Sequence, residues 1–326
     1  MNLKKQAPFL TIGIPTFNRP SELVVSIESI VSQMNWKTIE NLEIIVSDNC
    51  SVEDSNSVLE HLSRLAPNLH IFRNKTNIGY DRNIQNIFEQ AQGEFVLILA
   101  DDDRLKKDAL SLVFNVVEQG NTDIILFETD FFDAELKHGV SIEEEFFQSV
   151  GATEFFLTGE NLLTSLDVEF FGGITGYCMR RSLWLKSEPQ RFFDSNWIHL
   201  GVLLSVISKS SITVVREKYF DYRMDNKHSR WKQLNVSLGI AKIYANSGLL
   251  NYRSCKIGYD KYRKEFLILV LRNQFSLREF PSLVIGVIRL HESLFRIQFF
   301  KDLLILLVAV FVPKKQLNRF LDWRIS

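Results

Sequence analysis

The chain has 326 residues, of which 46% are hydrophobic and 24% charged, and its formal net charge is −1. This length can bury a large core and suits one large domain with an appendage, or two domains. The composition excludes a disordered chain, and the near-neutral charge gives no signal for a nucleic-acid partner. Three distant cysteines without metal-type spacing favour a reduced, cytoplasmic location. The N-terminal residues lack an apolar core segment, so no signal peptide is predicted.

Strand and helix patterns alternate along the first 130 residues. Short apolar runs predict five buried strands, at Leu10–Ile14, Leu42–Val46, Leu69–Phe72, Phe95–Leu99 and Asp123–Phe127. Apolar residues three or four apart predict a helix in each interval, on the faces Leu23/Ile27/Ile30/Val31, Leu59/Leu62/Leu65, Ile84/Ile87/Phe88/Ala91 and Leu110/Val113/Phe114/Val117. Asn18 is expected to cap the first helix, with Pro20 in its first turn. The alternation predicts an α/β fold with a doubly wound, mostly parallel sheet.

The alternation fades beyond Phe131. Residues 151–230 mix glycines, aromatics and polar residues irregularly, and from Leu234 onward the pattern becomes helical. No strand is followed by GxGxxG or GxxxxGK[ST], which disfavours a dinucleotide-binding Rossmann site and a P-loop.

Three adjacent carboxylates, Asp101, Asp102 and Asp103, follow the strand predicted at Phe95–Leu99. Ligands bind at such strand ends in open α/β sheets, and clustered carboxylates are costly without a positive partner. Mg²⁺ or Mn²⁺ carrying a diphosphate satisfies both conditions, which indicates a nucleotide-dependent transferase. The alternative is a solvated loop that caps the next helix, where acidic residues are favoured in any case.

An ordered set of motifs resembles the family 2 glycosyltransferases of the GT-A fold. The matching pieces are Ile14–Arg19, Val46–Ser51, Asn77–Asn83, Gly93–Asp103, Arg180–Arg181 and Tyr222–His228. Together they span most of residues 10–230, and within the family the chain looks most similar to bacterial O-antigen, abequosyltransferase-like enzymes. The resemblance implies a GT-A domain over residues 1–232, with a nucleotide-sugar-binding half at 1–130 and an acceptor half at 131–232. A C-terminal helical region at 233–326 would follow.

The resemblance assigns most of the donor site to the carboxyl ends of the strands. Asp48 would read the nucleobase, because a carboxylate can accept the N3–H of a pyrimidine, or it is only an Asx-turn residue. Arg19 and Arg82 are weighed against ordinary surface arginines, and Gly79 against a plain turn. The residues expected to contact the nucleotide-sugar are Pro15, Thr16, Asn18, Arg19, Asp48, Asn77, Gly79, Arg82, Asp101, Arg223 and His228.

The metal ligands implied by the resemblance are Asp102 first and Asp103 second. The family motif is Asp-x-Asp-Asp, and its first carboxylate falls on Ala100 in this chain, which is a departure from the pattern. Asp101 is therefore assigned to donor binding.

The base that deprotonates the acceptor hydroxyl is the other departure. The Glu-Asp pair of the family falls near Ser195 and Asn196. Asp194 and His199 are the local candidates, with Asp194 slightly ahead, because an acid or imidazole of suitable pKa could remove the proton. The alternatives are a loop acid and a structural histidine.

Arg223 and His228 lie in the polar segment that would close over the diphosphate, with a basic surface turn as the alternative. Lys227 stands where processive synthases carry glutamine, which argues against processive synthesis.

The C-terminal stretch from Leu283 to Val312 is apolar with interspersed basic residues, and its uninterrupted run, Leu303–Val312, is too short to span a membrane. It fits either a membrane interface or a core or dimer interface. The polyprenyl-diphosphate acceptors of the resembled enzymes favour the inner face of the cell membrane.

The sequence therefore predicts transfer of one sugar, with inversion, from a nucleotide-diphosphate sugar to a hydroxyl of a lipid-linked saccharide. Two alternatives remain: a degenerate transferase-like scaffold, for which Ala100 and the missing Glu-Asp pair speak, and a nucleotidyltransferase. The latter would carry a glycine-rich and basic loop after the first strand, and Ile14–Arg19 is not one.

Overall fold

The computed structural model describes residues 8–52, 56–62, 64, 66, 68–133, 135–139, 153–165, 173–224 and 230–273. Two compact units make up the chain, Met1–Asp225 and Asn226–Ser326. His228 and the predicted membrane or dimer segment at residues 283–312 lie outside the described residues.

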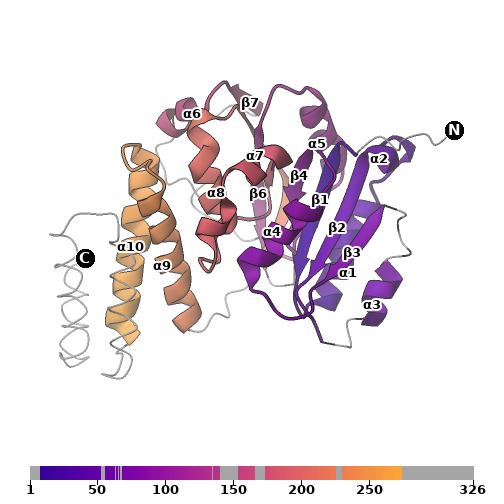
Figure 1. Ribbon diagram of the computed structural model, residues 1–326, viewed down its shortest axis with the longest axis horizontal. Helices are drawn as coiled ribbons and strands as arrows, with labels where there is room; N and C mark the ends of the chain where they lie inside the picture. Colours follow the sequence, from indigo (N-terminus) through magenta and orange to yellow (C-terminus); the bar gives the residue numbers. More distant parts are fainter. Residues whose placement is uncertain are drawn as a thin grey trace. The chain divides into compact units, whose positions relative to one another are not determined.

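The first unit is built on one sheet (Figure 1). Within the described residues the strand order is β3-β2-β1-β4-β8-β6-β9-β5, with β7 paired to β9. The strands are β1 Leu10–Thr16, β2 Leu42–Asp48, β3 Leu69–Arg73, β4 Phe95–Ile98, β5 Arg104–Leu105, β6 Ile124–Phe132, β7 Thr153–Phe156, β8 Tyr177–Arg180 and β9 Ile212–Arg223.

The four strands β3, β2, β1 and β4 are parallel to their neighbours, and β8 then runs antiparallel between β4 and β6. In the register of β1 and β2, Thr16 lies opposite Asp48. The carboxyl ends of these strands therefore meet at one edge of the sheet, where a parallel α/β sheet binds ligands. The predicted α/β fold with a mostly parallel sheet is confirmed.

Helices cover both faces of the sheet. Alternate β1 residues Leu10, Ile12 and Ile14 pack in one buried cluster with residues of α1 and α5. On the other face α4 lies against β1, because a Cβ built on Gly13 would be 2.2 Å from Ile87 of α4. The helices of this unit are α1 Pro20–Val31, α2 Trp36–Asn41, α3 Asn56–Leu62, α4 Tyr80–Gln90, α5 Ala109–Glu118, α6 Gly159–Ser165, α7 Arg181–Lys186 and α8 Ile198–Val206, with 3₁₀ turns η2 Pro189–Phe192 and η3 Ile207–Lys209.

Two expectations from the sequence are wrong in detail. Asn18 does not cap α1: the N-cap is Arg19, and the Asn18 side chain instead accepts the Val52 N–H at 3.0 Å. Residues 173–224 are not irregular but form β8, α7, α8 and β9. The pattern missed α8 because almost all of its residues are buried, so the helix has no polar face and no amphipathic period.

The second unit contains α9 Arg230–Asn246 and α10 Arg253–Asn273 in its described part. The two helices pack closely, since a Cβ on Gly258 of α10 would lie 2.5 Å from the Tyr244 ring of α9. Across the described helices of both units, none combines the length and the apolar character that a membrane crossing requires.

Candidate active site

Three strand ends bring the predicted donor-site residues to one edge of the sheet. Thr16 ends β1, Asp48 ends β2, and Asp101 follows β4. The Thr16 hydroxyl donates to Asp101 Oδ2 at 2.7 Å, which ties the first strand to the acidic turn. Pro15 lies one residue earlier in β1, opposite Ser47 of β2.

Within the part of the chain that the structure describes, Arg19 pairs with the acidic turn, and two further contacts anchor it. Arg19 forms an ion pair with Asp102 and lies 3.5 Å from Asp101. Asp103 is 1% exposed, and its oxygens accept hydrogen bonds from the Thr175 hydroxyl and from the Arg223 backbone N–H at 2.8 Å. Of the three carboxylates, Asp102 has the most exposed side chain, at 16%.

Burial raises the pKa values of two carboxyl groups in this turn. It raises the pKa of Asp101 to about 7, against the opposing hydrogen bond from Thr16. Burial and the neighbouring Asp102 raise the pKa of Asp103 to about 8. Both shifts mean that the ionised form of these carboxyls is costly where they lie, and a bound cation would relieve that cost.

The acidic turn fits a divalent cation that is shared with a ligand. Its carboxylate oxygens are the hard donors that Mg²⁺ and Mn²⁺ prefer, and Mg²⁺ is commonly held by one or two carboxylates plus substrate phosphates. In the part of the chain that the structure describes, no three His, Cys, Asp or Glu side chains are grouped closely enough to hold a metal alone. Asp102 suits the ligand role better than Asp103, both of whose oxygens already accept hydrogen bonds.

Arg223 joins this site through both its backbone and its side chain. Its N–H binds Asp103, and its guanidinium lies 3.8 Å from Glu22 in the first turn of α1. The neighbouring Tyr222 is half-buried, and desolvation of its hydroxyl together with Asp103 and Asp102 raises the pKa of that hydroxyl well above the usual range. The late segment of the acceptor half is thus adjacent to the acidic turn.

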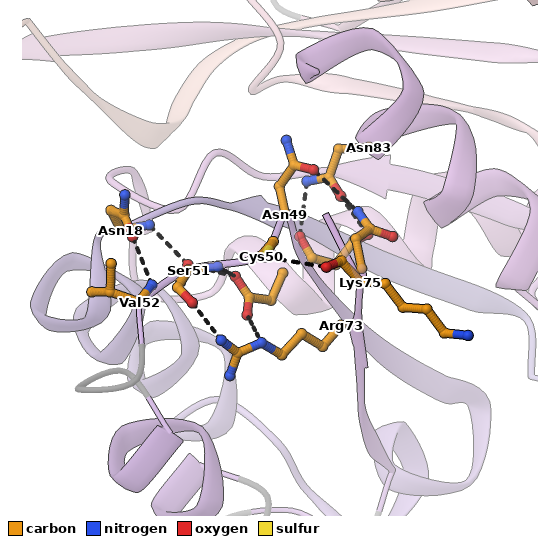
Figure 2. Close-up of polar contacts among 11 residues, drawn as sticks. Asn18, Asn49, Cys50, Ser51, Val52, Arg73, Lys75 and Asn83 are labelled. Atoms are coloured by element: carbon orange, nitrogen blue, oxygen red, sulfur yellow. Dashed lines mark hydrogen bonds and ion pairs between the residues drawn. The ribbon is translucent and has the colours of Figure 1, made fainter. Parts of the chain in front are cut away.

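Figure 2 shows a polar network that includes Asn49, Ser51 and Arg73. Asp48, the last residue of β2, belongs to this network through its contacts with Ser51 and Arg73. Its side chain is 0% exposed, and Oδ1 accepts the Ser51 N–H at 3.0 Å as an Asx turn would. Oδ2 lies 3.3 Å from Arg73 Nε but accepts no hydrogen bond from the described residues. Asp48 therefore has the predicted turn role, and its second oxygen is buried beside the Arg73 guanidinium.

The Asn77–Gly79 loop is fastened to the same network. Asn77 Oδ1 accepts from Asn49 Nδ2 at 3.0 Å and from the Gly79 N–H at 2.9 Å. Gly79 precedes α4 with φ +85°, a conformation that glycine adopts without strain. Asn18 reaches the network from β1, since its N–H donates to Ser51 Oγ at 2.9 Å.

Arg82 lies beside Asp194. The guanidinium contacts Asp194 Oδ1 at 2.6 Å and Oδ2 at 3.4 Å, and lies 4.6 Å from the Phe193 ring centroid. The Asp194 side chain is 78% exposed, and the hydrogen bond from Arg82 lowers its pKa. The two residues thus form a surface ion pair with each other.

His199 lies in the first turn of α8 and is 3% exposed. Its ring is surrounded by aromatic residues, with centroids 5.3 Å from Trp197, 5.8 Å from Tyr177 and 6.4 Å from Tyr80. Tyr80 connects it to the acidic turn: burial, then Tyr222, Asp81, Asp102 and Asp101 raise the pKa of its hydroxyl.

Sequence reasoning missed four residues that shape this site: Thr175, Arg73, Tyr80 and Asp81. Thr175 and Arg73 give no pattern of their own, because their partners lie 72 and 22 residues away in the chain. Tyr80 and Asp81 lie inside the Asn77–Asn83 motif. Acidic residues are common in the first turn of a helix, where the helix dipole favours them, so Asp81 gave no separate signal.

Comparison with known proteins identifies the family. The sequence model described as "Glycosyl transferase family 2" matches residues 11–185. A GalNAc(5)-diNAcBac-PP-undecaprenol beta-1,3-glucosyltransferase of Campylobacter jejuni is 28% identical over 239 residues, which cover 72% of this chain and 69% of the relative. The abequosyltransferase RfbV of Salmonella typhimurium is 33% identical over 106 residues, 32% of this chain and 31% of its own.

Among solved structures, the first 349 residues of Staphylococcus aureus TarS superimpose with a TM-score of 0.59 at 18% identity. The match covers 92% of this chain and 86% of that one, and it shows the same GT-A fold. The chain belongs to glycosyl transferase family 2 and is a glycosyltransferase. The resemblance predicted from the ordered motifs is confirmed.

Proposed function

We propose that this glycosyltransferase moves one sugar from a nucleotide-diphosphate sugar to a hydroxyl of a polyprenyl-diphosphate-linked saccharide, in the assembly of a bacterial surface polysaccharide. The observation that carries the proposal is the meeting of Asp48 and the acidic turn at one sheet edge. At that edge, Asp48 can accept a hydrogen bond from the nucleobase, and the carboxylates of the acidic turn can bind a metal ion that carries the diphosphate. The named activities of the relatives support the acceptor class.

UDP is the proposed nucleotide of the donor. TarS has been solved with UDP and with UDP-GlcNAc bound. In this chain Asp48 ends β2 at the same sheet edge, and a carboxylate there can accept the N3–H that uracil carries and cytosine lacks. Mg²⁺ or Mn²⁺ would be held by Asp102, with Asp101 and Asp103 balancing its charge, and when bound it would stabilise the negative charge of the leaving diphosphate.

His199 is the proposed base, with Asp194 as the second candidate. The ion pair with Arg82 lowers the pKa of Asp194 and makes that carboxylate a weaker base. His199 instead packs against Tyr80, whose hydroxyl is sensitive to Asp101 and Asp102. An imidazole at this point can take the proton of the acceptor hydroxyl as it attacks the sugar carbon by direct displacement, which implies inversion.

The test is transfer of radiolabel from UDP-glucose, UDP-GlcNAc and UDP-GalNAc, one at a time, to undecaprenyl-diphosphate-linked oligosaccharides. The proposal expects label in the organic phase with one donor, released UDP in equal amount, and loss of both with EDTA. The anomer of the product, read by NMR, reports inversion. If no donor gives transfer or UDP release, the result favours the scaffold alternative. Release of pyrophosphate would favour a nucleotidyltransferase.

A further inference from the structure

Asp81, in the first turn of α4, binds the backbone between the two candidate bases, Asp194 and His199. Its side chain is buried, with the residue 2% exposed. Oδ2 accepts the Asn196 N–H at 2.9 Å and Oδ1 accepts the Ile198 N–H at 3.1 Å. The two partners are 115 and 117 residues away in the chain, so these bonds are tertiary contacts between α4 and the start of α8.

This contact replaces a cap that α8 does not supply itself. The N-cap residue of α8 is Trp197, which makes no side-chain capping hydrogen bond. A helix leaves its first N–H groups without intrahelical partners, and they are normally satisfied by a nearby Ser, Thr, Asp or Asn. Here the acceptor comes from another helix, so the position of the first turn of α8 depends on α4.

The loop before α8 has a backbone conformation that carries an energetic cost. Asp194 and Asn196 both have positive φ, at 64° and 61°, which non-glycine residues adopt at a cost. Asp81 binds the N–H of the second of them and, past Trp197, that of Ile198. His199 is the residue directly after Ile198, so its backbone is fixed by the same carboxylate.

The neighbours of Asp81 join the donor side to this loop. Tyr80 packs against the His199 ring, and Arg82 pairs with Asp194. The same turn begins at Gly79, which Asn77 links to Asn49, the residue after Asp48 at the end of β2. One helical turn thus contacts the donor edge at its start and the base-carrying loop along its side.

We propose that Asp81 is a positioning residue for sugar transfer: by capping α8 from α4 it sets His199 at the distance from the acceptor hydroxyl that the reaction requires. The inference rests on the proposed function, because it acts through His199 as the base. A misplacement of a reacting group by about 1 Å can cost on the order of 100-fold in rate without loss of binding. Asp81 is therefore expected to affect turnover and not donor affinity.

The variant that tests this is Asp81→Asn. Asparagine is as good a helix cap as aspartate, but it offers one carbonyl oxygen to two N–H donors, so one of the two contacts is lost. Asp81→Ser serves as the second variant, since serine also caps but is shorter. The matched control is Glu43→Gln: Glu43 is another buried carboxylate, whose Oε2 accepts the Gln92 N–H at 2.8 Å, but it lies at the opposite end of β2 from Asp48.

Turnover is measured as UDP release from the donor used by the wild-type protein, with Mn²⁺, and is expressed per UDP-binding site from calorimetry so that unfolded molecules do not count. We expect kcat to fall by about 10- to 100-fold in Asp81→Asn and Asp81→Ser, with the Kd for UDP within about twofold of wild type. Glu43→Gln is expected to keep kcat per site.

A double variant shows whether Asp81 acts through His199. If it does, Asp81→Asn combined with His199→Gln turns over no more slowly than His199→Gln alone, because a positioning residue has nothing left to position. If the double variant lost activity by the product of the two single losses, or if Asp81→Asn kept its kcat, the inference would be overturned and the proposed function would remain intact. A wild-type kcat in His199→Gln, or no UDP release by the wild-type protein, would overturn the base assignment or the proposed function first, and the inference with it.

Discussion

The two halves of the first unit contribute to the site in different ways. The half up to β4 presents Thr16, Asp48 and Asp101 because parallel strands in register end at one edge. The half from β8 to β9 contributes Thr175, His199 and Arg223 through contacts over long sequence distances. The first is a property of the fold, whereas the second depends on particular side chains, so single substitutions should separate donor binding from turnover.

The largest effect is expected from His199→Gln, in the second half. Losing a general base typically costs 10²- to 10⁴-fold in rate, so kcat should fall by at least about 100-fold while the Kd for UDP stays near wild type. Asp194→Asn is the matched comparison, because it removes the other candidate base and only a surface ion pair; we expect less than about a threefold loss. The reverse order of the two losses, measured as kcat under saturating donor, would move the base to Asp194.

A smaller loss is expected where the two halves touch. The Thr175 hydroxyl donates to Asp103 and accepts the Ala100 N–H at 3.0 Å, so Thr175→Val removes both hydrogen bonds and leaves Asp103 with the one from the Arg223 N–H. We expect a loss of about 1–3 kcal/mol in the free energy of unfolding and roughly a tenfold loss of kcat/KM.

Thr11→Val is its control. Thr11 likewise donates to a buried carboxylate, Glu43, at 2.6 Å and accepts the Gly93 N–H at 3.0 Å, but near the amino end of β1. It should lose a similar amount of stability by denaturant unfolding and keep its kcat/KM. Equal activity losses in the two variants would mean that Thr175 matters only for stability.

Asp48→Asn should change nucleotide preference in the first half. The variant replaces one carboxylate oxygen of Asp48 by an NH₂ group, which cannot accept the uracil N3–H. UDP binding should weaken by about 10-fold, equal to about 1.4 kcal/mol, whereas CDP binding should change little. An unchanged ratio of UDP to CDP affinity in calorimetry would remove Asp48 from base recognition.

The smallest effect concerns pH and metal. Asp101 and Asp103 have pKa values raised to about 7 and about 8, so the folded state binds more protons than the unfolded state between about pH 4 and pH 8. Their contribution to stability is present at low pH and is lost as pH rises through 7 to 8. Without metal, Tm should therefore fall by a few degrees from pH 6 to pH 8.5. Mn²⁺ competes with these protons, so it should raise Tm more at pH 8.5 than at pH 6. An equal Mn²⁺ shift at both pH values in differential scanning calorimetry would contradict a metal at the acidic turn.

Much of the first half could be predicted from the sequence because its signals are local. The apolar runs ending at Val46 and Leu99 mark buried strands, and the polar residues after them, Asp48 and Asp101, must then lie at the sheet edge. The second half could not be predicted in this way. Helix α8 is buried on all sides, and the partner of its first turn, Asp81, lies more than a hundred residues earlier.

The same contrast holds for single charged residues. The sequence leaves Arg82 open between a phosphate contact and a surface charge, and in the structure its side chain pairs with Asp194, a residue that only the folded loop brings near. Arg19 was weighed as a surface arginine, and the structure pairs it with Asp102. Ion pairs between segments that are far apart in the chain leave no regular spacing in the sequence, so they cannot be predicted from it.

The most direct test of the central claim, that Asp102 holds a divalent cation against a nucleoside diphosphate, is calorimetric titration of UDP, CDP, GDP and dTDP with and without Mn²⁺. We predict that wild-type protein binds UDP at least about 10-fold more tightly with Mn²⁺, a difference of about 1.4 kcal/mol. Asp102→Asn should keep the metal-free affinity and lose the enhancement, and Glu43→Gln should keep both. Full Mn²⁺ enhancement in Asp102→Asn, or no binding of any of the four nucleotides by the folded wild-type protein, would contradict the account.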